Sequence, residues 1–135
     1  MIRLLIADDE ALERETLADI VARRFEHEVT IETAENGRKA ADTAVLWGAD
    51  LILMDIEMPG MSGIALAQRL KEACPRGNIV FVTGFSQYMA EAFQLHASGY
   101  IMKPVTVRAV EEELRNLRYP PQATEEPRLR VQAFG

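Results

Sequence analysis

Short apolar runs alternate with amphipathic stretches over most of the chain. Five runs have the length and content of buried strands, at residues 2–7, 29–34, 50–55, 79–84 and 98–104. The third run, DLILMD, is apolar at successive positions, which is typical of a strand covered by helices on both faces. The intervening stretches predict helices at residues 10–25, 35–47, 63–73 and 86–97, and Thr106 can cap a last helix.

This alternation indicates an α/β fold with a doubly wound five-stranded parallel sheet and helices on both faces. We assign residues 1–118 to this domain and expect a linker at the Pro-rich, acidic stretch 119–127. Residues 128–135, RLRVQAFG, have the pattern of a starting strand. We interpret them as the first strand of a truncated second domain, with a frayed tail or an extra edge strand as alternatives.

Charge and composition exclude several classes of function. The net charge is −6, and residues 119–135 carry two acidic and two basic side chains, so the whole excess lies on residues 1–118. An acidic surface repels phosphates, which argues against nucleic-acid binding by this segment. No apolar run reaches the roughly 18 residues of a membrane span, and no signal peptide is recognisable. A single cysteine excludes an internal disulfide, so we expect a cytoplasmic protein.

Polar residues that could take part in binding or catalysis lie at the ends of four predicted strands. Asp8 and Asp9 follow the first strand, Asp55 ends the third, Thr83 lies at the end of the fourth, and Lys103 follows the fifth. Ligands of doubly wound sheets bind beyond the carboxyl ends of the strands, so these side chains are expected to meet at one edge.

Three carboxylates in one place need a counter-charge, and a divalent cation with oxygen ligands, such as Mg²⁺, supplies it. Lys103 adds an ammonium and Thr83 a hydroxyl, which together form a cradle for phosphoryl transfer to a carboxylate. Taken singly, these residues have simpler explanations. Asp9 could cap the helix that begins near Glu10, and Asp55 could cap the turn before Pro59.

The combination resembles the receiver domain of two-component response regulators, a flavodoxin-like fold. The resemblance rests on ADDE after the first strand, MDIEMPGMSG around Asp55, TG at 83–84 and GYIMKPV with Tyr100, Lys103 and Pro104. It covers residues 1–118 and implies a signalling domain with at most slow self-dephosphorylation, not an enzyme.

The resemblance implies a role for each matching residue. Asp55 would accept a phosphoryl group from a sensor histidine kinase. Mg²⁺ or Mn²⁺ would be held by Asp8, Asp9, Asp55 and the backbone carbonyl of Glu57. Lys103 would contact the phosphoryl oxygens, and its bond to Pro104 would be cis.

The resemblance also implies a switch. Thr83 would move toward the phosphoryl group and Tyr100 would follow, which reshapes the face of the fourth helix, fifth strand and fifth helix. Receivers use this face for phosphorylation-dependent homodimers or for effectors. Glu57 and Phe85 stand where the family tunes hydrolysis of the acyl phosphate.

The residues FSQYMAEAFQLHASGYIMKPV resemble receivers linked to transcriptional output domains, and RLRVQAFG resembles the first strand of a bacterial transcriptional activator domain. A stand-alone or phosphorylation-independent protein-binding receiver is the alternative. Two other classes fit less well. A haloacid dehalogenase-type phosphatase has its nucleophile after the first strand, and a flavodoxin-like cofactor carrier needs a phosphate loop where this chain has acids.

Overall fold

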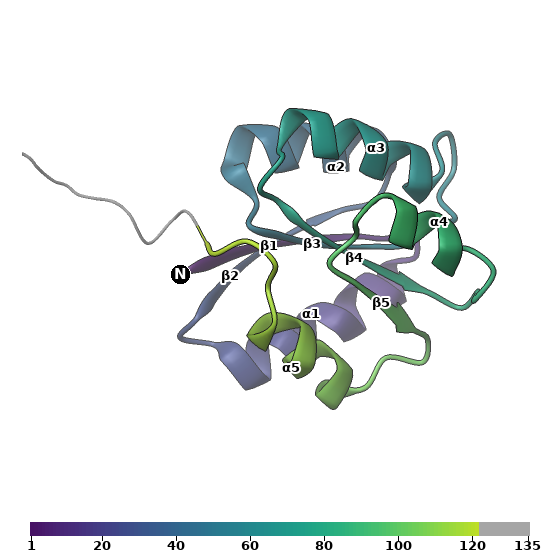
Figure 1. Ribbon diagram of the computed structural model, residues 1–135. Coiled ribbons are helices and arrows are strands. Elements are labelled where there is room, and N and C mark those ends of the chain that lie inside the picture. The colour runs from purple at the N-terminus through teal and green to yellow at the C-terminus, as the bar shows by residue number, and fades with distance from the viewer. Residues whose placement is uncertain (122–135) are drawn as a thin grey trace, which may run out of the picture.

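The computed structural model describes residues 1–121 and has a five-stranded sheet between two layers of helices (Figure 1). The strands are β1 (Ile2–Ala7), β2 (Val29–Ala34), β3 (Leu51–Met54), β4 (Asn78–Thr83) and β5 (Gly99–Met102). All neighbours are parallel and the order is β2-β1-β3-β4-β5, which confirms the predicted fold class. The stretch 128–135 that we interpreted as a further strand lies outside the described residues, as does the linker from residue 122 onward.

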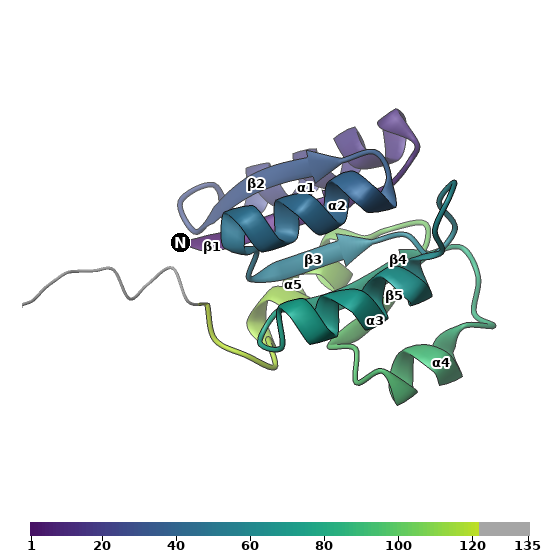
Figure 2. The same cartoon turned by 90° about the horizontal axis from the view of Figure 1, so that it is seen from above.

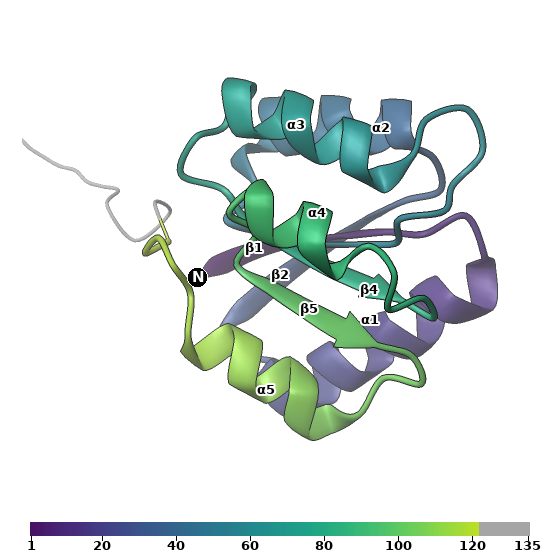
Figure 3. The same cartoon turned by 45° about the vertical axis from the view of Figure 1, so that its right-hand side comes forward.

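Helices cover both faces of the sheet, as the view from above shows (Figure 2). They are α1 (Ala11–Phe25), α2 (Gly37–Thr43), the π-helical turn η1 (Ala44–Gly48), α3 (Gly63–Ala73), α4 (Met89–Gln94) and α5 (Val107–Arg115). Helices α1 and α5 pack on one face, and α2, α3 and α4 on the other (Figure 3). No helix within residues 1–121 is long and apolar enough to cross a membrane.

Alternate residues of the central strands enter two separate cores. In β1, Leu4 and Ile6 join the core under α1 and α5, whereas Leu5 and Ala7 join the core under α2 and α3. All four residues of β3 are buried. Burial on both faces explains why these strands are apolar at successive positions.

Two predicted helices differ from those in the structure. The helix predicted at 86–97 is shorter at both ends, because Ser86 accepts a turn hydrogen bond from the Met89 amide and His96 has a left-handed φ of 59°. The helix predicted at 35–47 is divided. Helix α2 ends at Thr43, and the next turn widens so that the Ala49 amide reaches the carbonyl of Ala44.

Candidate functional site

The strand order brings the ends of β1 and β3 together. Ala7 pairs with Met54, so Asp8 and Asp55 leave the sheet side by side, and the Asp55 amide donates to the carbonyl of Ala7 at 2.9 Å. From β1 the chain adds β2 on one side and β3 on the other. The end of β1 is therefore a switch point of strand order, where doubly wound folds bind ligands.

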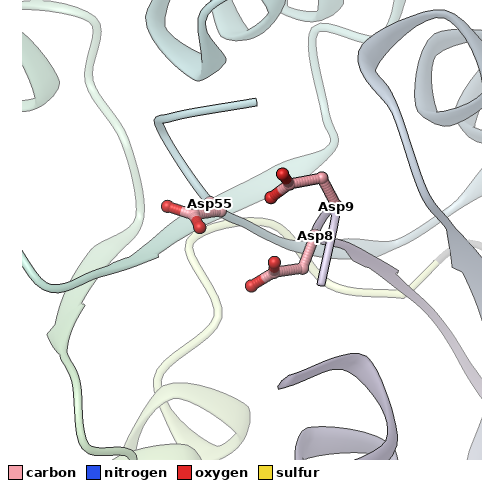
Figure 4. A group of neighbouring side chains, drawn as sticks. All are labelled: Asp8, Asp9 and Asp55. Carbon is pink, nitrogen blue, oxygen red and sulfur yellow. The ribbon is translucent and has the colours of Figure 1, made fainter. Parts of the chain in front are cut away.

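Three carboxylates gather at this edge (Figure 4). One oxygen from each of Asp8, Asp9 and Asp55 lies within 4.8 Å of the others. Asp8 is buried, Asp9 is exposed and Asp55 is intermediate. The set of oxygen donors suits a hard divalent cation.

The two simpler explanations of the aspartates fare differently. The role of Asp9 as a helix cap is wrong, because Glu10 occupies the N-cap of α1 and no side chain caps it. The Glu10 amide instead donates to Asp8 Oδ1 at 3.0 Å. Asp55 Oδ1 does accept a hydrogen bond from the Glu57 amide at 3.3 Å, so Asp55 orders the following turn, while its Oδ2 accepts a hydrogen bond from Lys103.

Lys103 follows β5 and extends its ammonium into the cluster. Its Nζ lies 3.0 Å from Asp8 Oδ2 and 3.2 Å from Asp55 Oδ2. Burial alone would lower the pKa of Lys103, but the hydrogen bonds and charges of the two aspartates outweigh it and raise the pKa. Lys103 is therefore a permanent cation, and its bond to Pro104 is cis.

The carboxyl of Asp55 is held in a partly desolvated place. Burial raises its pKa, the positive charge of Lys103 opposes that shift, and the charge of Asp8 reinforces it.

The backbone behind Asp55 is closely packed against the start of α3. A Cβ added to Gly63 would lie 2.4 Å from the carbonyl oxygen of Asp55, so only glycine lets α3 start this close to the site.

Thr83 and Tyr100 both bond to the backbone of Phe85. Thr83 is fully buried at the end of β4, and its Oγ1 accepts from the Phe85 amide at 3.3 Å. The Tyr100 hydroxyl donates to the Phe85 carbonyl, and its ring centroid lies 6.2 Å from that of Phe81. Phe85, the residue expected to tune hydrolysis of the acyl phosphate, is therefore hydrogen-bonded through its backbone to both expected switch residues, Thr83 and Tyr100.

Three further residues at the site were not anticipated from sequence. Tyr88 donates its hydroxyl to Glu57 Oε2 at 3.0 Å, and its ring meets Phe85 edge-on. Glu13 is 3.2 Å from Lys103 Nζ, and the guanidinium of Arg14 donates to the carbonyl of Asp8 at 2.8 Å. Glu13 and Arg14 lie in the first turn after the acidic pair, which was the available signal; nothing in the sequence marked Tyr88.

Known proteins are similar in sequence to most of this chain. Residues 4–115 match the model of the response regulator receiver domain. A positive alginate biosynthesis regulatory protein of Pseudomonas aeruginosa is 37% identical over 117 residues, which cover 87% of this chain and 47% of that protein. The sensory transduction protein LytT of Bacillus subtilis is 35% identical over 118 residues, which cover 87% of this chain and 48% of that protein.

Solved structures agree. The response regulator protein TrrA of Thermotoga maritima, crystallised in complex with Mg²⁺-BeF, has a TM-score of 0.78 and 32% identity, over 87% of this chain and 99% of that one. The chain spans about half the length of the curated relatives named above. With its acidic edge, its Lys103 contacts and its match over residues 4–115, the chain belongs to the response regulator receiver domain family, a family of signalling domains.

Proposed function

We propose that Asp55 is the phosphoacceptor of this receiver domain and that a sensor histidine kinase supplies the phosphoryl group. One observation carries the assignment: Lys103 Nζ contacts both the buried Asp8 and the Asp55 carboxylate at the carboxyl edge of the sheet. A fixed cation beside a partly exposed carboxylate is what an incoming phosphoryl group requires.

In the proposed reaction a carboxylate oxygen of Asp55 attacks phosphorus. The new O–P bond forms as the P–N bond of the phosphohistidine breaks. The P–N electron pair stays on the ring nitrogen, and the imidazole leaves as a neutral ring because its other nitrogen already carries a proton in the phosphohistidine. Lys103 stabilises the negative charge on the phosphoryl oxygens. The Glu57 amide, already bonded to Asp55 Oδ1, keeps the nucleophile in place.

We propose that the side chains of Asp8, Asp9 and Asp55 and the backbone carbonyl of Glu57 hold Mg²⁺ or Mn²⁺. Carboxylate oxygens within 4.8 Å of one another support this donor set. When bound, such a cation supplies charge neutralisation for phosphoryl transfer.

The output is proposed to run through Thr83 and Tyr100. Movement of Thr83 toward a phosphoryl group breaks its hydrogen bond with the Phe85 amide. The carbonyl of Phe85 accepts a hydrogen bond from the Tyr100 hydroxyl, so a change at Phe85 reaches Tyr100. Large apolar side chains are exposed on α4, β5 and α5, namely Met89, Phe93, Met102 and Val107. We propose that this face forms a phosphorylation-dependent homodimer or contacts an output domain that controls transcription.

Glu57 and Phe85 are proposed to tune a slow hydrolysis of the acyl phosphate. Both are exposed, and Tyr88 contacts both of them. The position of Tyr88 thus determines how these two side chains are presented to water at the site.

The test is incubation with acetyl phosphate and Mg²⁺ followed by intact mass spectrometry. Wild type should gain one phosphate that hydroxylamine removes, and Asp55→Ala should gain none. Asp42→Asn, on α2 and away from the carboxylate cluster, serves as the control and should behave as wild type. If the wild-type protein stays unmodified and also shows no spectral change with beryllofluoride and Mg²⁺, the phosphoacceptor proposal is wrong. The remaining interpretation is then a phosphorylation-independent binding module.

A further inference from the structure

Lys103 contacts a third carboxylate, which the proposed reaction leaves without a role. Its Nζ is 3.2 Å from Glu13 Oε1, about as close as it is to Asp55. Lys103 Nζ donates hydrogen bonds to Asp8 and Asp55, and Glu13 is a third carboxylate in ion-pair contact with the same ammonium.

Glu13 differs from the two aspartates in where it comes from. It stands on the first turn of α1, a separate rigid element, and its side chain is 38% exposed against 12% for Asp55. Glu13 and Lys103 line the same open hollow between α1 and the segment after β5, together with Leu12 and Pro104. The ammonium can therefore be approached by an anion from the side of Glu13.

The balance of charge around Lys103 changes during phosphoryl transfer. The Asp55 carboxylate becomes a neutral acyl oxygen and a phosphoryl dianion takes its place. Asp8 belongs to the proposed metal site and keeps its place at the carboxyl edge of the sheet. Glu13 remains as a fixed negative charge next to the cation that the dianion must reach, and like charges this close repel.

We propose that Glu13 is a positioning residue that competes with the phosphoryl group for Lys103. It thereby limits both the rate of Asp55 phosphorylation and the affinity of the site for the phosphoryl group. The inference rests on the proposed function. Because Glu13 is more than a third exposed, the effect is modest. Removing its charge should speed phosphorylation about three- to fivefold, in line with a partly exposed ion pair.

The experiment compares Glu13→Gln with Glu15→Gln. Both remove one negative charge from α1, but Glu15 is exposed and lies outside the Lys103 hollow. The rate of phosphorylation is measured against acetyl phosphate concentration at saturating Mg²⁺, and beryllofluoride affinity is measured by NMR titration. Thermal unfolding of each variant shows that the fold is kept.

Glu13→Gln should raise the apparent affinity for both anions several-fold over Glu15→Gln. If both variants match each other, or if Glu13→Gln is slower, the inference is overturned. A wild type that takes up no phosphate and shows no spectral change with beryllofluoride and Mg²⁺ would instead overturn the proposed function, so the two failures are distinguishable. Glu13→Asp, whose shorter side chain draws back from Lys103, should fall between Glu13→Gln and wild type.

Discussion

The side-chain amide of Asn78 makes two hydrogen bonds to the backbone of Tyr119, at the end of the sheet opposite Asp55. Its Nδ2 donates to the Tyr119 carbonyl at 2.8 Å, and its Oδ1 accepts from the Tyr119 amide at 2.9 Å. Asn78 is fully buried, and Lys71 and Arg76 lie over the Tyr119 ring. The segment that follows α5 is thereby attached to the start of β4.

Asn78→Ala should lower the free energy of unfolding by about 2 kcal/mol, because the partly buried Tyr119 backbone groups and the buried Asp50 carbonyl each lose a hydrogen bond from the Asn78 side chain. Urea unfolding followed by circular dichroism measures the change. The control is Asn116→Ala, whose exposed amide donates to the Glu112 carbonyl. It should cost about 0.5 kcal/mol or less. Equal losses in the two variants would contradict a special role of the hydrogen bonds between Asn78 and the Tyr119 backbone.

Gly63→Ala should destabilise the domain by about 2 kcal/mol or more, because its new methyl meets backbone that cannot rotate away. The methyl carbon would lie 2.4 Å from the Asp55 carbonyl oxygen and 2.6 Å from Ile56 Cα. The same displacement should slow phosphorylation of Asp55. Gly84→Ala is the matched control, because a methyl added there would have no atom within 4 Å and its φ is not left-handed. It should be neutral or stabilise by about 0.5 kcal/mol. Thermal unfolding of both variants provides the comparison.

Glu113→Gln should stabilise the protein at neutral pH. Burial, and secondly the charge of Glu112, raise the pKa of Glu113 in the folded state. Folding therefore favours the protonated form. The contribution of Glu113 is fully present below its unfolded pKa and is lost as the pH rises through the folded pKa. The gain from Glu113→Gln in urea unfolding should thus be seen at neutral pH and vanish in acid; a pH-independent gain would refute this origin.

Glu57→Gln should lower the pKa of Tyr88. The hydrogen bond to the Glu57 carboxylate is the main cause of the raised pKa of Tyr88, and the charge of Glu91 contributes least. An NMR titration of the Tyr88 ring carbons measures the shift, with Glu91→Gln as a control of the same charge change. The Glu57 variant should show the larger drop. Equal drops would mean that Tyr88 and Glu57 are not bonded in solution.

Local pattern was sufficient for the strands and for the aspartates and lysine at their ends. The runs at 2–7 and 29–34 coincide with β1 and β2, since continuous or alternating apolar residues report burial directly. The carboxyl ends of parallel strands share one edge, so the meeting of Asp8, Asp55 and Lys103 also follows from their places in the sequence. Helix ends were less accurate, because a turn such as that at Ser86 depends on single hydrogen bonds.

By itself, the sequence determined the order of elements, the sheet edge that carries the chemistry and the residues that form its acidic centre, because these depend on periodicity and on strand ends. Only the tertiary structure decided which side chains from other elements reach that centre or close the opposite end of the sheet. Glu13 meets Lys103, Tyr88 meets Glu57 and Tyr119 meets Asn78. Each pair joins residues at least 31 positions apart, and such contacts depend on how helices pack on the sheet, which no local pattern encodes.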